Sequence, residues 1–171
     1  MRKVTQRVAF FGICTSVALV LAYIELLIPP LFAAVPGIKL GLPNILIIFI
    51  LYRFGLRSAA TVSLVRIALV SLLFGNTMTL AYSLAGAVLS LAAMSLLKKM
   101  NFLSTVGVSV AGGVFHNIGQ ILMAMLLLRT AELGYYLIIL ALTGTIAGIL
   151  IGLCGGMLIS RIKFNIFSKS S

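Results

Sequence analysis

The chain has almost no acidic residues: Glu25 and Glu132 are the two among 171, and there is no aspartate. A general acid and base, or a Mg²⁺ site, usually needs paired carboxylates, and these two glutamates are far apart in the sequence. No G-x-x-x-x-G-K-[ST] motif is present to bind and hydrolyse ATP. The sequence therefore predicts no catalytic residue and no cofactor, and it disfavours catalysis by this chain alone.

Metal-ligand and disulfide patterns are also missing. The single histidine, His116, has no cysteine, acidic residue or second histidine at ligand spacing, so we expect no zinc site. Cys14 and Cys154 each stand alone in an apolar run, where cysteine behaves as a small buried hydrophobic residue. The sequence thus predicts neither a metal site nor a disulfide framework.

What the chain has in excess is apolar sequence. Hydrophobic residues make up 62% of it and charged residues 9%, against roughly 45–50% and about 25% in soluble domains. A soluble globule could not hide this apolar surface, since about a third of its chain surface stays exposed at this size. We therefore expect a lipid bilayer as the environment and a single transmembrane domain over residues 1–171.

Proline, glycine and basic residues divide the chain into six apolar segments. A transmembrane helix needs about 20 residues, and five of the segments approach this length. The second is too short to cross unless the Gly- and Pro-rich loop at 36–44 dips into the membrane from outside. We predict an all-α bundle of six transmembrane helices, with spans at about 8–28, 43–52, 58–74, 79–97, 104–128 and 133–159.

The net charge of +11 could indicate nucleic-acid binding, but the basic residues separate the apolar segments instead of clustering. Lys and Arg accumulate on the cytoplasmic loops of membrane proteins. If the spans alternate from a cytoplasmic N-terminus, only Lys39 and Arg129 fall outside, and Arg66 lies within a span. The other ten fall inside: Arg2, Lys3, Arg7, Arg53, Arg57, Lys98, Lys99, Arg161, Lys163 and Lys169. We expect cytoplasmic termini and no nucleic-acid partner.

Arg66 is the most unusual residue of the apolar segments. It lies nine residues after Arg57, about 13 Å along a helix, and hence near the bilayer centre. A charged side chain there costs about 2.5–3.5 kcal/mol and faces the bundle interior or a wet cavity. It could bind carbonyls and hydroxyls such as that of Ser63 and lock two helices together. Because the sequence offers no acidic partner at that depth, we favour an anchor for an anionic ligand.

A polar patch is predicted in the fifth span. His116, Asn117 and Gln120 share a helical face through their i, i+3 and i, i+4 spacing and fall about halfway along the span. Hydrogen bonds between helices, worth about 0.6 kcal/mol each on average, would explain them. Three polar residues on one patch favour a cavity instead.

The start of the second span could complete such a cavity. Pro43 suits the first position of a helix. If the preceding loop dips inward, the helix start would offer free backbone N–H groups and its positive dipole end to an anion, with Lys39 nearby. An ordinary outer loop is the alternative. The candidate ligand-binding residues are Lys39, Asn44, Arg66, Asn76, His116, Asn117 and Gln120.

Small residues at four-residue spacing indicate close helix packing. In the sixth span they form a ridge of Gly144, Gly148, Gly152 and Gly156. In the cytoplasmic half of the first span, Gly12 and Ser16 form a shorter pair. Packing inside the bundle is the default for both series, and docking of the first span onto another membrane subunit is the alternative.

Several segments together resemble the Gx transporter family of bacterial membrane proteins, and the resemblance covers nearly the whole chain. They are Pro-Gly-Ile-Lys-Leu-Gly-Leu-Pro-Asn at 36–44, Ser-Leu-Val-Arg-Ile at 63–67, Ser-Leu-Leu-Phe-Gly at 71–75, Ser-Leu-Ala-Gly at 83–86 and Gly-Val-Phe-His-Asn-Ile-Gly-Gln at 113–120. Each piece alone is weak, but the combination is specific.

That family is similar to the substrate-binding S components of energy-coupling factor (ECF) transporters. The resemblance implies a six-helix protein that captures a vitamin or cofactor precursor from outside. It also implies a transmembrane coupling subunit and two ABC ATPases as partners. S components usually carry an Ala-xxx-Ala docking pair on helix one. Here Gly12 and Ser16 hold a comparable position, while Ala18 and Ala22 lie further out on a different face.

Members of this family are also often labelled heptaprenyl diphosphate synthase component I. Prenyl-chain elongation resembles other prenyl synthase chemistry in needing Asp-rich Mg²⁺ sites, which this chain cannot form. Two hypotheses follow. The first is an S-component-like subunit in the bacterial cytoplasmic membrane that binds a small anionic molecule for uptake. The second is a non-catalytic membrane subunit or scaffold linked to prenyl diphosphate or quinone metabolism.

Overall fold

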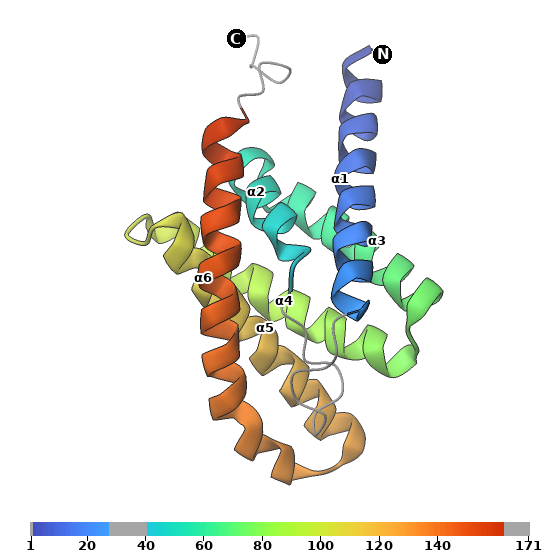
Figure 1. Cartoon of the computed structure of the whole chain (residues 1–171), viewed down its shortest axis with the longest axis vertical. Coiled ribbons are helices and arrows are strands. Elements are labelled where there is room, and N and C mark those ends of the chain that lie inside the picture. The colour runs from blue at the N-terminus through green and yellow to red at the C-terminus, as the bar shows by residue number, and fades with distance from the viewer. Residues whose placement is uncertain (1, 28–40, 163–171) are drawn as a thin grey trace.

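The computed structural model describes residues 2–27 and 41–162, and of residues 2 and 3 the backbone alone. This part of the chain is helical and contains no strand, so the predicted all-α fold is confirmed. Its elements are α1 (Arg2–Leu27), α2 (Asn44–Phe54), α3 (Leu56–Phe74), α4 (Thr77–Met100), α5 (Thr105–Leu128), the 3-10 helix η1 (Ala131–Tyr136) and α6 (Leu137–Arg161) (Figure 1).

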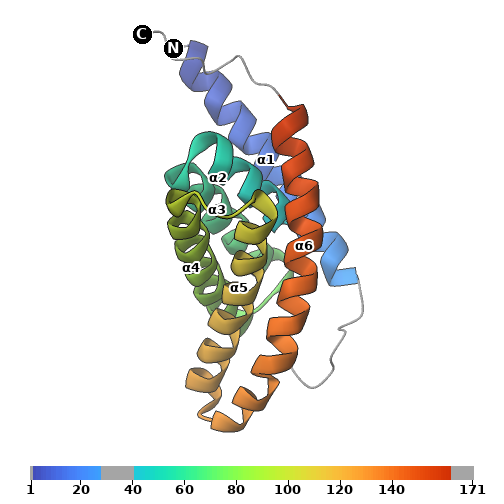
Figure 2. The same cartoon turned by 90° about the vertical axis from the view of Figure 1, so that its left-hand side faces the viewer.

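The helices form a bundle in which α1 begins and α6 ends at the same end of the molecule, as two perpendicular views show (Figures 1 and 2). Helix α5 packs between α4 and α6, and α2 packs against α3 and α6. Helix α1 is peripheral and contacts α3 and, more weakly, α2. Helix α1, which precedes the predicted dipping loop, therefore has fewer packing contacts with the rest of the bundle than any other α-helix.

Five helical segments are long and apolar enough to cross a membrane. These are Val4–Leu27, Leu56–Phe74, Thr77–Met100, Thr105–Leu128 and Ala131–Arg161. Helix α2 has 11 residues, about 16 Å of length at 1.5 Å per residue, which is half of a hydrocarbon core of about 30 Å. A multi-pass membrane bundle is confirmed, while the count of six crossings and cytoplasmic termini stay predictions.

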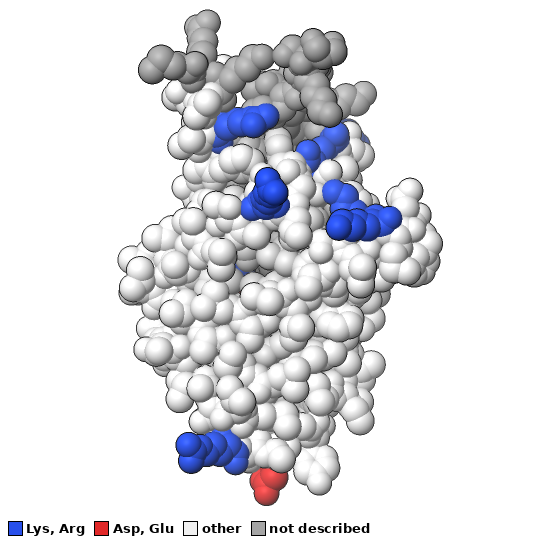
Figure 3. Space-filling model, turned by 180° about the vertical axis from the view of Figure 1, so that it is seen from behind, with Lys and Arg blue, Asp and Glu red and all other residues white. Residues whose placement is uncertain are grey.

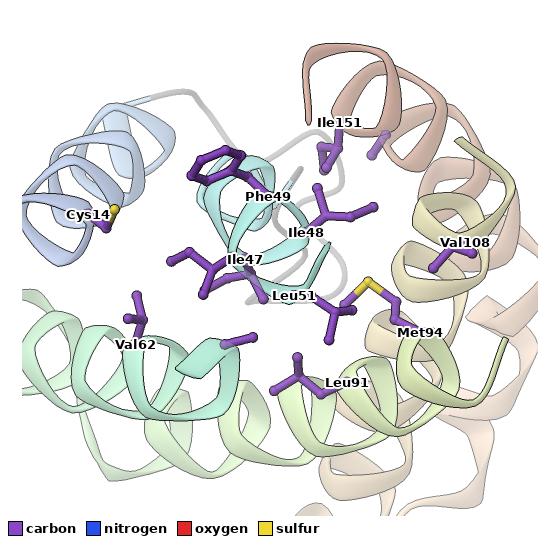
Figure 4. Close-up of a cluster of buried hydrophobic side chains, with 13 residues drawn as sticks. Cys14, Ile47, Ile48, Phe49, Leu51, Val62, Leu91, Met94, Val108 and Ile151 are labelled. Carbon is purple, nitrogen blue, oxygen red and sulfur yellow. The ribbon is translucent and has the colours of Figure 1, made fainter. Parts of the chain in front are cut away.

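Helix α2 is short but forms the centre of the main hydrophobic cluster. A helix that is apolar on all sides is expected to be buried, and residues 47–51 are each at most 2% exposed. Figure 4 shows α2 surrounded by α1, α3, α4, α5 and α6, with Ile47 directed toward α3 and Ile48 toward α6. Close packing around α2 fixes where its first residues lie.

The carboxyl end of α2 is held by a glycine turn and a lysine. Gly55 alone links α2 to α3 and has φ +86°, a conformation that favours glycine. The Nζ of Lys98 donates to the carbonyl oxygen of Leu51 at 2.6 Å and to that of Tyr52 at 3.4 Å, and it lies 4.9 Å from the centre of the Tyr52 ring. Since the last carbonyls of a helix lack partners within it, Lys98 caps α2.

Several helices extend past the predicted spans. Helix α1 begins at Arg2, and α4 continues through Lys98 to Met100, because Lys and Arg are good helix formers and hydropathy does not mark where a helix ends. The last α-helix starts later than the predicted sixth span, since residues 131–136 form η1 and α6 runs from Leu137 to Arg161. The predicted dip at 36–44 lies mostly outside the described residues.

Charged side chains gather at the two ends of the molecule. In Figure 3, basic side chains cluster toward the end where α1 begins and α6 ends, and the band below them is uncharged on this face. The opposite end carries exposed Arg129 and Glu132, where α5 gives way to η1. This is the distribution that the positive-inside rule describes.

The glycine ridge of α6 faces α5. A Cβ atom added to Gly148 would lie 2.5 Å from the Cα of Val110, and one added to Gly152 would lie 2.7 Å from the Cα of Val106. Gly144 similarly approaches the carbonyl oxygen of Gly113. The small side of α6 therefore lets two helix backbones approach closely.

Gly156 does not continue this ridge, because a Cβ atom there would meet nothing within 4 Å. Four-residue steps advance by about 400° around a helix with 3.6 residues per turn. Three such steps turn Gly156 about 120° away from Gly144. Gly155, eleven residues after Gly144, lies nearly in line with it and packs against Ile48 of α2.

Candidate functional site

Polar side chains are buried between the helices. Among the described residues these are Glu25 on α1, Ser63 and Arg66 on α3, Ser90 on α4, and Ser109, His116, Asn117 and Gln120 on α5. Burying a polar group costs free energy unless it finds a hydrogen-bond partner. So many buried polar side chains in an apolar bundle therefore indicate either a functional site or hydrogen bonds that hold the helices together.

Two neighbouring cavities lie among these residues. The first cavity, of about 30 Å³, is lined by Ala22, Glu25, Gly41, Asn44, Arg66, Ile67, Val70, Ser83, His116 and Gln120. The second cavity, of about 20 Å³, is lined by Gly41, Asn44, Ile48, Ser90, Met94, Ser109, Gly112, Gly113, His116, Asn117, Gly144, Ala147 and Ile151. Gly41, Asn44 and His116 line both, so the cavities adjoin at the start of α2.

Arg66 lines the first cavity, and one of its donors has no partner. It is 8% exposed, and its Nε has no hydrogen-bond partner. No hydrogen bond to Ser63, the hydroxyl that could have locked it, occurs among the described residues. Arg66 thus places guanidinium donors in a buried space without a side chain or carbonyl that accepts from Nε.

Glu25 supplies the acidic neighbour that the sequence analysis did not expect, so that expectation was wrong. Glu25 is 7% exposed, lines the same cavity and attracts Arg66 electrostatically. Depth had been judged from position along upright helices. In Figure 1, α3 runs obliquely across the lower part of α1, and the two helices are in contact. Glu25 and Arg66 line the same cavity.

The start of α2 reaches the cavity as expected, but four of its N–H groups already have hydrogen-bond partners. The backbone N–H of Gly41 donates to the carboxylate of Glu25. Three further N–H groups close the first turn of the helix: Asn44 donates to the carbonyl of Gly41 at 2.8 Å, Ile45 to that of Leu42 at 3.1 Å, and Leu46 to that of Pro43 at 3.1 Å. These four N–H groups are therefore already bonded, which weakens the predicted backbone anion site.

The polar face of α5 divides between two tasks. The Nδ2 of Asn117 donates to the carbonyl oxygen of Leu140 at 2.8 Å, which ties α5 to α6. Gln120 is 7% exposed, and its Oε1 has no hydrogen-bond partner. Gln120 lines the first cavity, Asn117 the second, and His116 both. Asn117 is the member of the face with a clear structural role.

The remaining predicted residues are divided. Asn44 lines both cavities, whereas Lys39 lies outside the described residues. Asn76 is exposed and caps α4, accepting from the backbone N–H of Thr79 at 2.8 Å and from its Oγ1 at 3.0 Å. A side chain with a capping role at an exposed helix start does not join the buried cluster.

Sequence reasoning missed Glu25 and Ser83 in the first cavity and Ser90 and Ser109 in the second. A signal for Glu25 was present. Cys14, Ala18, Ala22 and Glu25 follow one another at steps of four, four and three residues, the spacing of a single helix face. All four are buried, so Glu25 ends the stripe by which α1 packs on the bundle.

The predicted docking pair lies on the other side of α1. Gly12 and Ser16 are exposed, a Cβ atom on Gly12 would meet nothing within 4 Å, and the Oγ of Ser16 donates to the carbonyl of Gly12 at 3.0 Å. Ala18 and Ala22 face the bundle. The pair is therefore open to lipid or to another subunit.

Comparison with known proteins gives one assignment. Residues 14–158 match the family described as heptaprenyl diphosphate synthase component I. The chain belongs to this family. The comparisons with curated proteins and with solved structures found no significant match.

The family's name refers to one component of a synthase. We therefore ask which side chains of the site could hold a metal ion. No group of three or more His, Cys, Asp or Glu side chains that could hold a metal ion occurs in residues 2–27 and 41–162. In this family member, Glu25 faces Arg66 and Gly41, and the other glutamate, Glu132, is exposed at the opposite end. Within the described residues, Glu25 thus takes part in polar contacts at the first cavity.

Proposed function

We propose that this member of the family is the membrane-embedded substrate-binding subunit, similar to an S component, of an energy-coupling factor ABC transporter. It would reside in the bacterial cytoplasmic membrane and capture a small polar molecule, a vitamin or cofactor precursor, from outside. Its partners would be a transmembrane coupling subunit and two ABC ATPases.

The observation that carries this proposal is the buried and underused hydrogen-bonding capacity of the first cavity. Arg66 and Gln120 are each more than nine-tenths buried, and Arg66 Nε and Gln120 Oε1 have no partner. Leaving a buried donor or acceptor unsatisfied costs about 1–3 kcal/mol, and more for a charged group. A ligand that satisfies these groups would recover that free energy, which a purely structural cluster would not need.

The cavity is small in the described conformation. A volume of about 30 Å³ has room for about two water molecules, whereas ligand pockets usually measure about 300–1,000 Å³. We infer that this conformation is closed and that capture requires α1 to move. Helix α1 is the peripheral helix, and it brings Glu25 and Ala22 to the cavity wall.

The anionic character predicted for the ligand loses much of its support. It rested on an Arg66 without an acidic neighbour, on free N–H groups at the start of α2, and on Lys39. In the structure, Glu25 is an acidic neighbour of Arg66. Turn hydrogen bonds engage N–H groups at the start of α2, and Lys39 lies outside the described residues. The proposed function therefore keeps a small polar ligand without an anionic charge.

A second candidate is a non-catalytic membrane subunit or scaffold of a prenyl diphosphate synthase. The family's description names one component of such a synthase. The absence of aspartate from the whole chain is compatible with such a subunit, provided that a partner performs the chemistry. The buried polar cavity is harder to explain by this candidate, since a scaffold needs a surface more than an interior.

Affinity purification of the tagged chain from native membranes separates the two candidates. Transport predicts co-elution of ABC ATPases and a membrane coupling subunit. Scaffolding predicts co-elution of a soluble prenyl synthase. A matched control is the chain with Gly12→Leu, which alters an exposed face of α1 and should release the coupling subunit. Co-elution of the prenyl synthase without any ATPase would contradict the transport proposal.

A further inference from the structure

We propose that Glu25 is a built-in counter-ion of Arg66, and that the first cavity therefore takes a ligand without net charge that offers both a hydrogen-bond acceptor and a donor, as an amide or lactam edge does. This inference rests on the proposed function, because it names the chemical class that the same cavity would bind.

The first step is the charge of the cavity wall. Among its described lining residues, Arg66 carries one positive charge and Glu25 one negative charge. The remaining polar side chains are Asn44, Ser83 and Gln120, which are uncharged, and His116, which is counted as neutral in the formal charge at pH 7. The described part of the wall then carries no net charge, although it contains a buried cation.

The second step is the cost of adding a charged ligand. An anion beside Arg66 would also lie near Glu25, because both side chains border one cavity of about 30 Å³. Attraction to the cation and repulsion from the carboxylate would largely cancel. The loss of hydration of a charged group in a low-dielectric interior would then go uncompensated. A neutral polar ligand avoids most of that cost.

The third step is the pattern of groups that still need partners. Arg66 Nε is a donor and Gln120 Oε1 is an acceptor, and both are buried without a partner. Both residues line the first cavity. A ligand that satisfies both must present an acceptor to the arginine and a donor to the glutamine. A carboxylate has acceptors only, whereas a carboxamide or lactam has both on one edge.

Acetamide and acetate provide a matched pair of probes, because they have the same size and shape and differ in charge and in the donor. The thermal stability of the purified full-length chain would be measured in detergent against rising concentrations of each. Sodium chloride would hold the ionic strength constant. A ligand that binds the folded state raises the melting temperature, so the ratio of half-saturating concentrations reports the preference.

We expect the wild type to prefer acetamide over acetate by at least tenfold. Glu25→Gln removes the counter-ion and should reverse the order, so that acetate becomes the stronger stabiliser. The double variant Glu25→Gln with Arg66→Gln lacks both charges and should show neither the reversal nor any stabilisation by acetate. If Glu25→Gln does not fold, Glu25→Ala in acetate tests the same step, because the added carboxylate fills the space of the missing one.

Two results would overturn the inference. One is a wild type that prefers acetate and loses this preference in Arg66→Gln, since the cavity would then be an anion site. The other is the same response of wild type and Glu25→Gln to both probes, including no response at all. Failure of the transport proposal would be seen separately, as the absence of ATPases in the affinity purification, and it would leave the probe preference unchanged.

Discussion

Substituting Gly148 of α6 tests whether the bundle depends on backbone contact between α5 and α6. In Gly148→Ala the new Cβ would lie 2.5 Å from the Cα of Val110, whereas carbon atoms pack best at about 3.5–4.0 Å. The contact is with backbone, so no side chain can rotate away. The two helices must separate by roughly 1 Å.

Gly156→Ala on the same helix is the matched control, because its Cβ would meet nothing within 4 Å. Both substitutions gain about the same helix propensity, roughly 1 kcal/mol, so this term cancels in the comparison. The difference between the variants is the overpacking cost, about 1–3 kcal/mol. At about 2–4 °C per kcal/mol for a chain of this size, Gly148→Ala should melt several degrees below Gly156→Ala.

The assay is thermal unfolding of both variants in the same detergent, followed by size-exclusion chromatography of heated samples. Separation of α5 from α6 would also lengthen the bond from Asn117 to the carbonyl of Leu140, which is 2.8 Å in the structure. If Gly148→Ala melts at or above Gly156→Ala, the close approach of the two helices is wrong.

Three further predictions concern the ends of the helices and the outer face of α1. Lys98→Met should lower the melting temperature by several degrees, because hydrogen bonds to a charged group contribute about 1.5–3 kcal/mol, whereas Lys99→Met, at an exposed neighbour, should not. Cysteine labelling of intact cells should reach a residue beside Arg129 and not one beside Lys98, and the reverse pattern would contradict the predicted orientation. Gly12→Leu or Ser16→Leu should abolish co-purification of a coupling subunit at unchanged thermal stability, and unchanged complexes in both variants would move the docking surface elsewhere.

Much of the fold was predictable because it follows from composition and spacing. Helical membrane segments must satisfy their own backbone hydrogen bonds in lipid, so long apolar runs broken by Pro43 or Gly55 identify helices directly. The ends were less predictable, since Lys98 continues α4 and caps α2. A span predicted from hydropathy ends at the first charged residues, even where the helix continues.

The site was predictable in part. Arg66, His116 and Gln120 stand out as polar residues within apolar runs, and the structure brings them to one cavity. Glu25 was missed because its place beside the same cavity as Arg66 depends on how α1 and α3 cross, which the spacing along one helix does not show. Asn76 was included for its residue type, yet it caps α4. Residue type identifies candidates, and helix tilt decides which of them meet.

The central claim is that the first cavity binds a small molecule through Arg66. Native mass spectrometry of the purified chain tests it most directly, with wild type and Arg66→Gln prepared in parallel and matched for thermal stability. We expect a small molecule to be retained by the wild type and at least tenfold less of it by Arg66→Gln, since one lost hydrogen bond to a charged group corresponds to about a factor of ten or more. Equal retention by both proteins, or no retained molecule on either, would contradict the account and leave Arg66 a structural residue of the bundle.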